Sequence, residues 1–189
     1  GTFEEYFISF RSTDGGRTWS AREELKGPFG REPYVTVLSD GTLLMSSHIL
    51  PRDANNEEPG APGKNYWYSY LHRSTNEGRT WTTHRIGQED GFPPNGQGTC
   101  TDRRAVELPD GTVLLGVASG MEDGNRTYMW RSTDFGKTWD KSTVCKNEGW
   151  RDLDGFFSNS DTFRLRSGKL LHVNRVESHR HPIEGQKPP

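Results

Sequence analysis

The sequence contains no long hydrophobic run and no excess of charge of one sign. Hydrophobic residues make up 30% of the 189 residues, and no run approaches the roughly 18 apolar residues of a membrane-spanning helix. The formal net charge is −2, with both signs scattered along the chain. A nucleic-acid binder usually carries a basic face, so this composition argues against that class of protein.

Cysteine is equally scarce, with only Cys100 and Cys145. Neither belongs to a CxxC pair or to a Cys/His cluster with zinc spacing, so no zinc site is predicted. The simplest interpretation is two buried thiols. A disulfide between them is the alternative in an oxidising compartment. No secretory signal is visible, but the chain begins with Gly1, so a leader removed earlier remains an open alternative.

Helical periodicity is also missing, and the pattern that replaces it is typical of short strands. The 22 glycines and the 11% aromatic residues fit strands joined by tight turns. Segments rich in β-branched and aromatic residues predict strands at 6–10, 34–38, 43–50, 67–71, 105–108, 113–118 and 128–130.

A nonapeptide occurs three times, at 11–19, 73–81 and 131–139, with starts 62 and 58 residues apart. Its Ser and Asp side chains are placed to accept hydrogen bonds from nearby backbone amides, and its Gly permits a left-handed residue. Its Trp is expected to point toward the core. Asn76 replaces the Asp in the second copy and can make the same local bond.

A second motif, containing Asp-Gly or Ser-Gly, alternates with the nonapeptide at 39–44, 109–115 and 166–171. Such a dipeptide between apolar runs predicts a two-residue hairpin turn.

The two motifs together predict four-stranded antiparallel meanders, each of which is one propeller blade. Within 1–176 we expect a half blade at 5–25, blades at 31–88 and 101–146, and a half blade at 160–176, followed by a polar tail at 177–189. Three blades' worth of sheet is fewer than the usual minimum of four for a closed ring. Either the chain is a piece of a longer protein, or two chains exchange their half blades and close a six-bladed ring.

The nonapeptide resembles the Asp-box, Ser-x-Asp-x-Gly-x-Thr-Trp, of sialidases and their relatives, also called the bacterial neuraminidase repeat. The resemblance implies an all-β fold, the six-bladed β-propeller of sialidase type, of which this chain covers about three blades. In that family the box lies on the outer rim, away from the active site. Asp14 and Asp134 are therefore predicted to be structural.

Family members hold the substrate carboxylate with three arginines, use a loop Asp as acid/base, and use a Tyr nucleophile activated by a Glu. Arg31, in Arg31-Glu-Pro33 ahead of a Gly-Thr-Leu-Leu turn, is similar to the first of these arginines. A salt bridge near the strand start is its alternative role. Asp53, in the long acidic and Gly/Pro-rich segment 51–63, is similar to the acid. A solvated carboxylate is its alternative, with Glu57 and Glu58 as substitutes.

The stretch 101–111 is similar to the family's Asn-Glu-x-x-Val-x-Glu-Leu-x-Asp-Gly. Asp102 takes the place of the Glu that assists the Tyr. The next family arginine falls on Ala118, so Arg103 or Arg104 is the candidate replacement. Residues 48–50 are His-Ile-Leu where sialidases typically have Glu-Gly-Arg.

The resemblance implies a sialidase-like exo-glycoside hydrolase acting on an acidic sugar, with no cofactor and no metal. One alternative is a non-catalytic propeller that binds carbohydrate or peptide; another is a glycosidase for a neutral or uronic sugar. We expect a glycan partner, no nucleic acid or membrane, and a secreted, periplasmic or cell-surface location; a homodimer that completes the propeller is the alternative to a fragment. The binding alternative would use aromatic stacking surfaces at Trp67, Tyr68, Tyr70, Phe92 and Trp150.

Overall fold

The structure is a computed structural model that describes residues 6–49, 68–92, 98–121, 124–141 and 155–178. These residues form twelve strands and one 3-10 helix, η1. The elements are β1 (Tyr6–Ser9), β2 (Glu23–Phe29), β3 (Arg31–Val37), β4 (Leu43–Ile49), β5 (Tyr68–Ser74), β6 (Thr82–Ile86), η1 (Gln88–Asp90), β7 (Thr99–Thr101), β8 (Val106–Glu107), β9 (Val113–Met121), β10 (Gly124–Ser132), β11 (Gly155–Arg164) and β12 (Leu170–Ser178). None of the described helical residues makes a segment long and apolar enough to cross a membrane.

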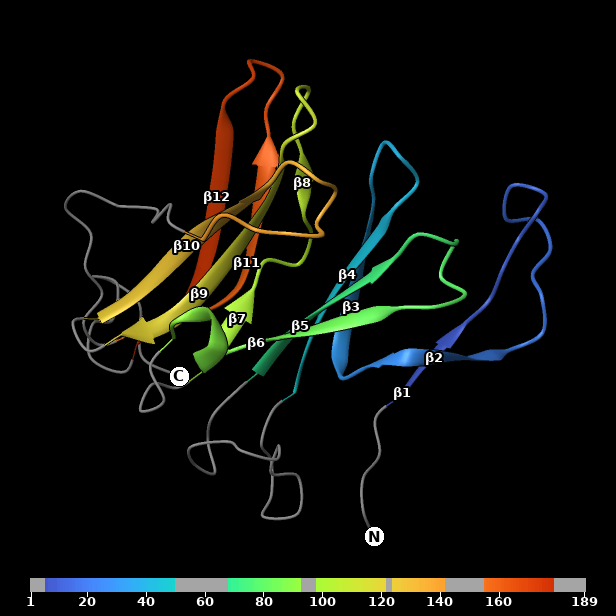
Figure 1. Cartoon of the computed structure of the whole chain (residues 1–189), viewed down its shortest axis with the longest axis horizontal. Helices are drawn as coiled ribbons and strands as arrows, with labels where there is room; N and C mark the ends of the chain where they lie inside the picture. Colours follow the sequence, from blue (N-terminus) through green and yellow to red (C-terminus); the bar gives the residue numbers. More distant parts are fainter. Residues whose placement is uncertain (1–5, 50–67, 93–97, 122–123, 142–154, 179–189) are drawn as a thin grey trace, which may run out of the picture.

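The strands form four separate antiparallel sheets that follow one another in chain order across the molecule (Figure 1). β1 and β2 form a two-stranded sheet, and β3, β4, β5 and β6 form a complete four-stranded meander. In the next sheet β7 and β8 both pair with β9, which pairs with β10. A single bridge between Arg131 and Asp140 adds the start of a fourth strand there. β11 and β12 form the last two-stranded sheet.

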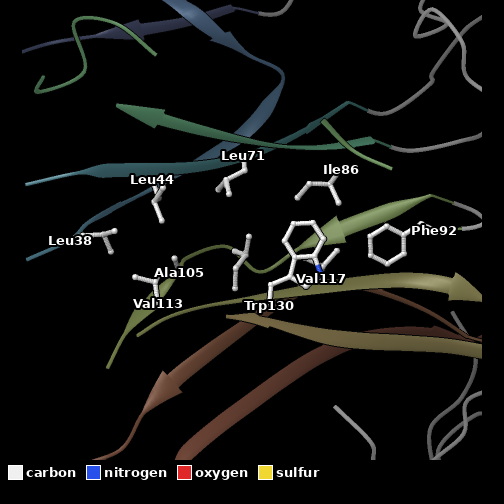
Figure 2. Close-up of a cluster of buried hydrophobic side chains, with 10 residues drawn as sticks. Leu38, Leu44, Leu71, Ile86, Phe92, Ala105, Val113, Val117 and Trp130 are labelled. Carbon is white, nitrogen blue, oxygen red and sulfur yellow. The ribbon is translucent and has the colours of Figure 1, made fainter. Parts of the chain in front are cut away.

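The main hydrophobic core lies between the two larger sheets (Figure 2). Leu44, Leu71 and Ile86 of one sheet face Val117 and Trp130 of the other, and all five are at most 4% exposed. A blade shares its core with its neighbour, so thin apolar patches on several strands suffice, which explains why 30% hydrophobic residues can support the fold.

The inner hairpin turns are one residue longer than the two-residue turns expected from the sequence. In the first, the Leu38 amide donates to the Thr42 carbonyl and the Gly41 amide donates to the Leu38 carbonyl. Residues 39–41 therefore form a three-residue loop, and the same bonds recur around Gly111 and Gly168. Only the glycine has a positive φ, 86° at Gly41, so these turns end in a glycine bulge rather than a mirror-image turn.

The nonapeptides are the turns between the two outer strands, and they are held together by their own side chains. In the first, Asp14 Oδ1 accepts hydrogen bonds from the Arg17 and Thr18 amides at 3.0 and 2.9 Å, and Ser12 Oγ accepts from the Gly16 amide at 2.8 Å. Hydrogen bonds from the Thr18 hydroxyl and amide, with one from Ser12, lower the pKa of Asp14 to about 2.

Asn76 in the second nonapeptide makes the local turn bond, as expected, although the Arg79 amide donates to the Asn76 backbone carbonyl and not to its side chain. Its Oδ1 accepts from the Thr80 amide at 2.9 Å and its Nδ2 donates to the Thr80 hydroxyl at 2.8 Å. The expectation for the Trp is met only where a neighbouring blade covers it. Trp139 packs against the core, whereas Trp19 of the first sheet is 62% exposed.

The first strand of each blade is irregular at the same distance from its turn. The register of β3 shifts between Arg31 and Tyr34, and that of β11 shifts between Ser158 and Asp161. In the middle blade the equivalent strand is divided into β7 and β8, with residues 102–105 between them. The interruption in the middle blade contains three of the residues proposed for the active site, Asp102, Arg103 and Arg104.

Candidate functional site

Arg31 is the first residue of β3, and its backbone partner is His48 near the end of β4. The next residue, Glu32, has a φ of 50°, and this left-handed residue produces the register shift that follows. β4 ends at Ile49 opposite Tyr68, the first residue of β5. The chain therefore leaves and re-enters this sheet at the Arg31 end. Asp53, Glu57 and Glu58 fall between these strands and lie outside the described residues.

Asp102 follows β7 and is fully buried, with 0% exposure. Its Oδ1 accepts the Ser160 hydroxyl at 2.5 Å, and its Oδ2 accepts the Thr162 hydroxyl at 2.5 Å and the Gly116 amide at 3.2 Å. A Cβ at Gly116 would overlap the carboxylate, so glycine is needed there. A carboxylate enclosed in this way joins two blades and does not itself touch a ligand.

His172 extends this buried network from β12. Its Nδ1 lies 2.8 Å from Thr162 Oγ1 and 3.7 Å from Asp102 Oδ2. Thr162 gives its only proton to Asp102, so the His172 Nδ1–H must be the donor to Thr162. Sequence reasoning missed Ser160, Thr162 and His172. The one available signal was the polar run 158–162 at a position where an inner strand was expected.

Arg103 and Arg104 lie in the interruption between β7 and β8 and extend toward different neighbours. The Arg103 guanidinium lies 5.0 Å from the centre of the Tyr34 ring in the preceding blade. Arg104 Nη2 lies 3.3 Å from Asp161 Oδ2 in the following blade. The Arg103 amide also donates to the Ser160 carbonyl at 3.0 Å. Arg103 Nε is buried and has no hydrogen-bond partner among the described residues, so this guanidinium keeps an unused donor.

Three of the five aromatic residues proposed as stacking surfaces are instead core residues. Tyr68, Tyr70 and Phe92 are 1%, 2% and 5% exposed. Tyr68 and Tyr70 pack with Phe29 and Ile49, and Phe92 belongs to the main core. Trp67 and Trp150 lie outside the described residues. The described aromatic side chains of this set therefore offer no surface to a sugar.

Another histidine, His72, is fully buried and is a structural residue. Its Nε2 lies 2.9 Å from Ser47 Oγ and its Nδ1 lies 2.8 Å from Thr83 Oγ1. Ser47 donates its proton to the Phe29 carbonyl, so His72 Nε2–H donates to Ser47 and cannot act as its base. Burial lowers the pKa of His72 to about 4.

No group of three or more metal-ligating side chains occurs in the described part of the chain. Cys100 is buried, at 6% exposure. Cys145 lies outside the described residues, so the alternative of a disulfide between them stays a prediction.

Comparison with known proteins identifies the same kind of fold as the repeated turns and the successive four-stranded sheets. The model of a family described as a BNR repeat-like domain matches residues 2–184. The chain belongs to the BNR repeat-like domain family. Its fold is that of a sialidase-type β-propeller, as the resemblance implied.

Two relatives of this BNR repeat-like chain carry the name sialidase. A sialidase from Paraclostridium sordellii is 27% identical over 143 residues, which cover 68% of this chain and 31% of that protein. The solved structure of the Hadza microbial sialidase Hz136 superposes with a TM-score of 0.53 at 18% identity. The superposed region covers 90% of this chain and 39% of the chain of that sialidase. The chain therefore spans about a third of the length of these relatives.

Proposed function

We propose that this BNR repeat-like protein is a sialidase-like exo-glycoside hydrolase that cleaves the bond to a terminal acidic sugar. The observation that carries the proposal is the position of Arg31. It begins the innermost strand of its blade, at the sheet end where the chain enters and leaves the segment that contains Asp53. Such a reaction needs a cation to bind the substrate carboxylate and an acid to protonate the leaving oxygen.

In this proposal Arg31 binds the substrate carboxylate, since a planar guanidinium makes two parallel hydrogen bonds to a carboxylate. Asp53 protonates the leaving oxygen as general acid. Arg103, whose side chain is partly exposed, is the second candidate to bind the substrate, and Arg104 is already paired with Asp161. Asp102 acts as a positioning residue, because its carboxylate fixes the segment between β7 and β8 that carries Arg103 and Arg104.

The proposal is tested by hydrolysis of a fluorogenic sialoside. Asp53→Asn removes the proton donor and is expected to lower kcat by about 100-fold or more. Asp14→Asn is the matched control, since the same Asp to Asn change on the outer turn reproduces the natural Asn76 and should leave the rate unchanged. Equal rates for the wild-type chain and Asp53→Asn would remove Asp53 from the mechanism.

One observation favours a second candidate, a carbohydrate-binding propeller without turnover. Asp102 stands where the family has the Glu that assists a tyrosine, but its carboxylate holds Ser160 and Thr162 instead. The two candidates separate in a glycan-binding measurement. Retention of a sialoside that Arg31→Met abolishes, together with no hydrolysis by the wild-type chain, would support binding alone.

A further inference from the structure

Arg31 and Tyr34 lie on the same face of their sheet, although they are three residues apart on β3. Arg31 pairs with His48 on β4. Tyr34 pairs with Ser46, two residues from His48 on the same strand. Residues opposite each other in an antiparallel pair share a face, and so do residues two apart on one strand. The left-handed Glu32 therefore returns Tyr34 to the face that carries Arg31.

This face of the β3–β6 sheet meets the next blade at Arg103. Ser46 Oγ donates to the Arg103 carbonyl at 2.8 Å, and the Arg103 guanidinium lies 5.0 Å from the centre of the Tyr34 ring. From the other side, the Arg103 amide donates to the Ser160 carbonyl at 3.0 Å. Arg103 is therefore held at its amide, at its carbonyl and at its guanidinium.

The neighbouring Arg104 is directed away from this junction. Its Nη2 lies 3.3 Å from Asp161 Oδ2 in the following blade, and this ion pair offsets its charge. Arg103 forms no ion pair with any described carboxylate. An aromatic ring holds a guanidinium without neutralising it, so Arg103 keeps the positive charge that attracts an acidic sugar.

We propose that Tyr34 is a positioning residue that directs Arg103 toward Arg31, so that the two arginines bind one acidic sugar across the junction between the β3–β6 and β7–β10 sheets. The β4 partners of Arg31 and Tyr34 are two residues apart, which is roughly 7 Å along a strand. One sugar ring with its carboxylate can bridge such a separation. This inference rests on the proposed function, in which both arginines bind the substrate.

Hydrolysis of the fluorogenic sialoside by the full chain is the first test. Tyr34→Leu removes the ring and should raise KM by about 3- to 30-fold at nearly unchanged kcat, because the carboxylate is bound alike in the substrate and in the transition state. Tyr34→Phe keeps the ring face and should restore the wild-type KM. In an Arg103→Met background, Tyr34→Leu should have no further effect.

Tyr6→Leu is the matched control. It removes the ring of another tyrosine–arginine pair, since the Arg22 guanidinium lies 5.7 Å from the centre of the Tyr6 ring on the first hairpin. This change should leave KM as it is in the wild type.

A binding measurement that needs no hydrolysis keeps this inference separate from the proposed function. Arg103 Nε is buried, so its N–H should exchange slowly with water and give a signal in a proton–nitrogen correlation spectrum, which Arg103→Met identifies by its loss. Protons above an aromatic ring are shielded, so Tyr34→Leu should move this signal downfield and Tyr34→Phe should not. Added N-acetylneuraminic acid should shift the wild-type signal, with a Kd that rises by about 3- to 30-fold in Tyr34→Leu.

The two measurements separate the possible failures. Binding of the sugar with these variant effects, but without hydrolysis, would refute the hydrolase and leave the role of Tyr34 standing. Equal KM for the wild type and Tyr34→Leu, or equal Kd where there is no hydrolysis, would overturn that role. So would a Tyr34→Phe variant as weak as Tyr34→Leu, or an Arg103 signal that the sugar does not move.

Discussion

Replacing Gly136 with alanine would test whether the turns of one blade are fitted against the core of its neighbour. Gly136 is the sixth residue of the third nonapeptide, with a φ of 74°. A Cβ there would lie 2.8 Å from Leu44 Cδ2 of the preceding blade. Leu44 is 2% exposed, so its side chain has little room to move away.

Two costs add at this position. An alanine forced into the left-handed region costs about 1–2 kcal/mol. Crowding of a filled core costs about 1–3 kcal/mol more, so we expect Gly136→Ala to destabilise the fold by about 2–5 kcal/mol. Gly111→Ala is the control in the same blade. Gly111 has a φ of 82°, but no atom lies within 4 Å of the place that an alanine methyl would take, so this change should cost only the backbone share, about 1–2 kcal/mol.

Urea unfolding followed by tryptophan fluorescence measures both variants, and an unchanged m value would show that the midpoint shift reports stability. A further variant, Leu44→Ala, removes the side chain that Gly136→Ala meets. The cost of Gly136→Ala should then fall toward that of Gly111→Ala, with the contact between the added Cβ and Trp139 Cζ2 at 3.3 Å remaining. Equal costs for Gly136→Ala and Gly111→Ala in the wild-type background would refute the close fit between turn and neighbouring core.

Two further predictions concern acid. His72 has a pKa of about 4 because it is buried, so the unfolded chain binds more protons between about pH 4 and 6.5, and stability should fall as the pH drops through that window by on the order of 3 kcal/mol. His72→Phe should flatten the profile of urea midpoint against pH, and parallel profiles would contradict neutral burial. For Asp134, partial burial raises the pKa, but hydrogen bonds from Thr138, Ser132 and Lys137 outweigh it and lower the pKa to about 2. The stabilisation of the fold by ionised Asp134 is therefore present above about pH 4 and is lost as the pH falls through 2. Asp134→Asn should remove that acid sensitivity while keeping the turn, whereas Asp134→Ala should cost about 1 kcal/mol at neutral pH through lost hydrogen bonds; equal acid midpoints for the wild type and Asp134→Asn would argue against it.

The local parts of the fold were predictable because their causes are local. The nonapeptide holds its own side-chain hydrogen bonds within nine residues, so its spacing alone predicted the outer turns and the repeated meander. The inner turns were predicted in place but not in length. Their third loop residue depends on a bond from the Leu38 amide to the Thr42 carbonyl, which Asp-Gly composition does not specify.

The contacts between blades were not predictable from the sequence. Asp102 was assigned by its place in a motif, but its environment is decided by Ser160 and Thr162, which lie 58 and 60 residues later. Arg11 and Arg73 stand before the Ser of the motif and were given no role, because their acceptors belong to the next repeat. The position of a residue within one repeat predicts its contacts inside that repeat. The residues of the candidate site make their contacts with neighbouring repeats.

The self-sufficiency of the nonapeptide turn has a consequence for how such proteins can grow. The exposed first copy, at Asp14, makes the same hydrogen bonds as the copy at Asp134. The copy at Asp134 is in contact with the preceding blade through Arg73 and Leu44. A hairpin that keeps its shape without help brings its correct geometry with it when its gene segment is duplicated or moved. New blades can then be added one at a time, and natural selection has only to improve the contacts between neighbouring blades.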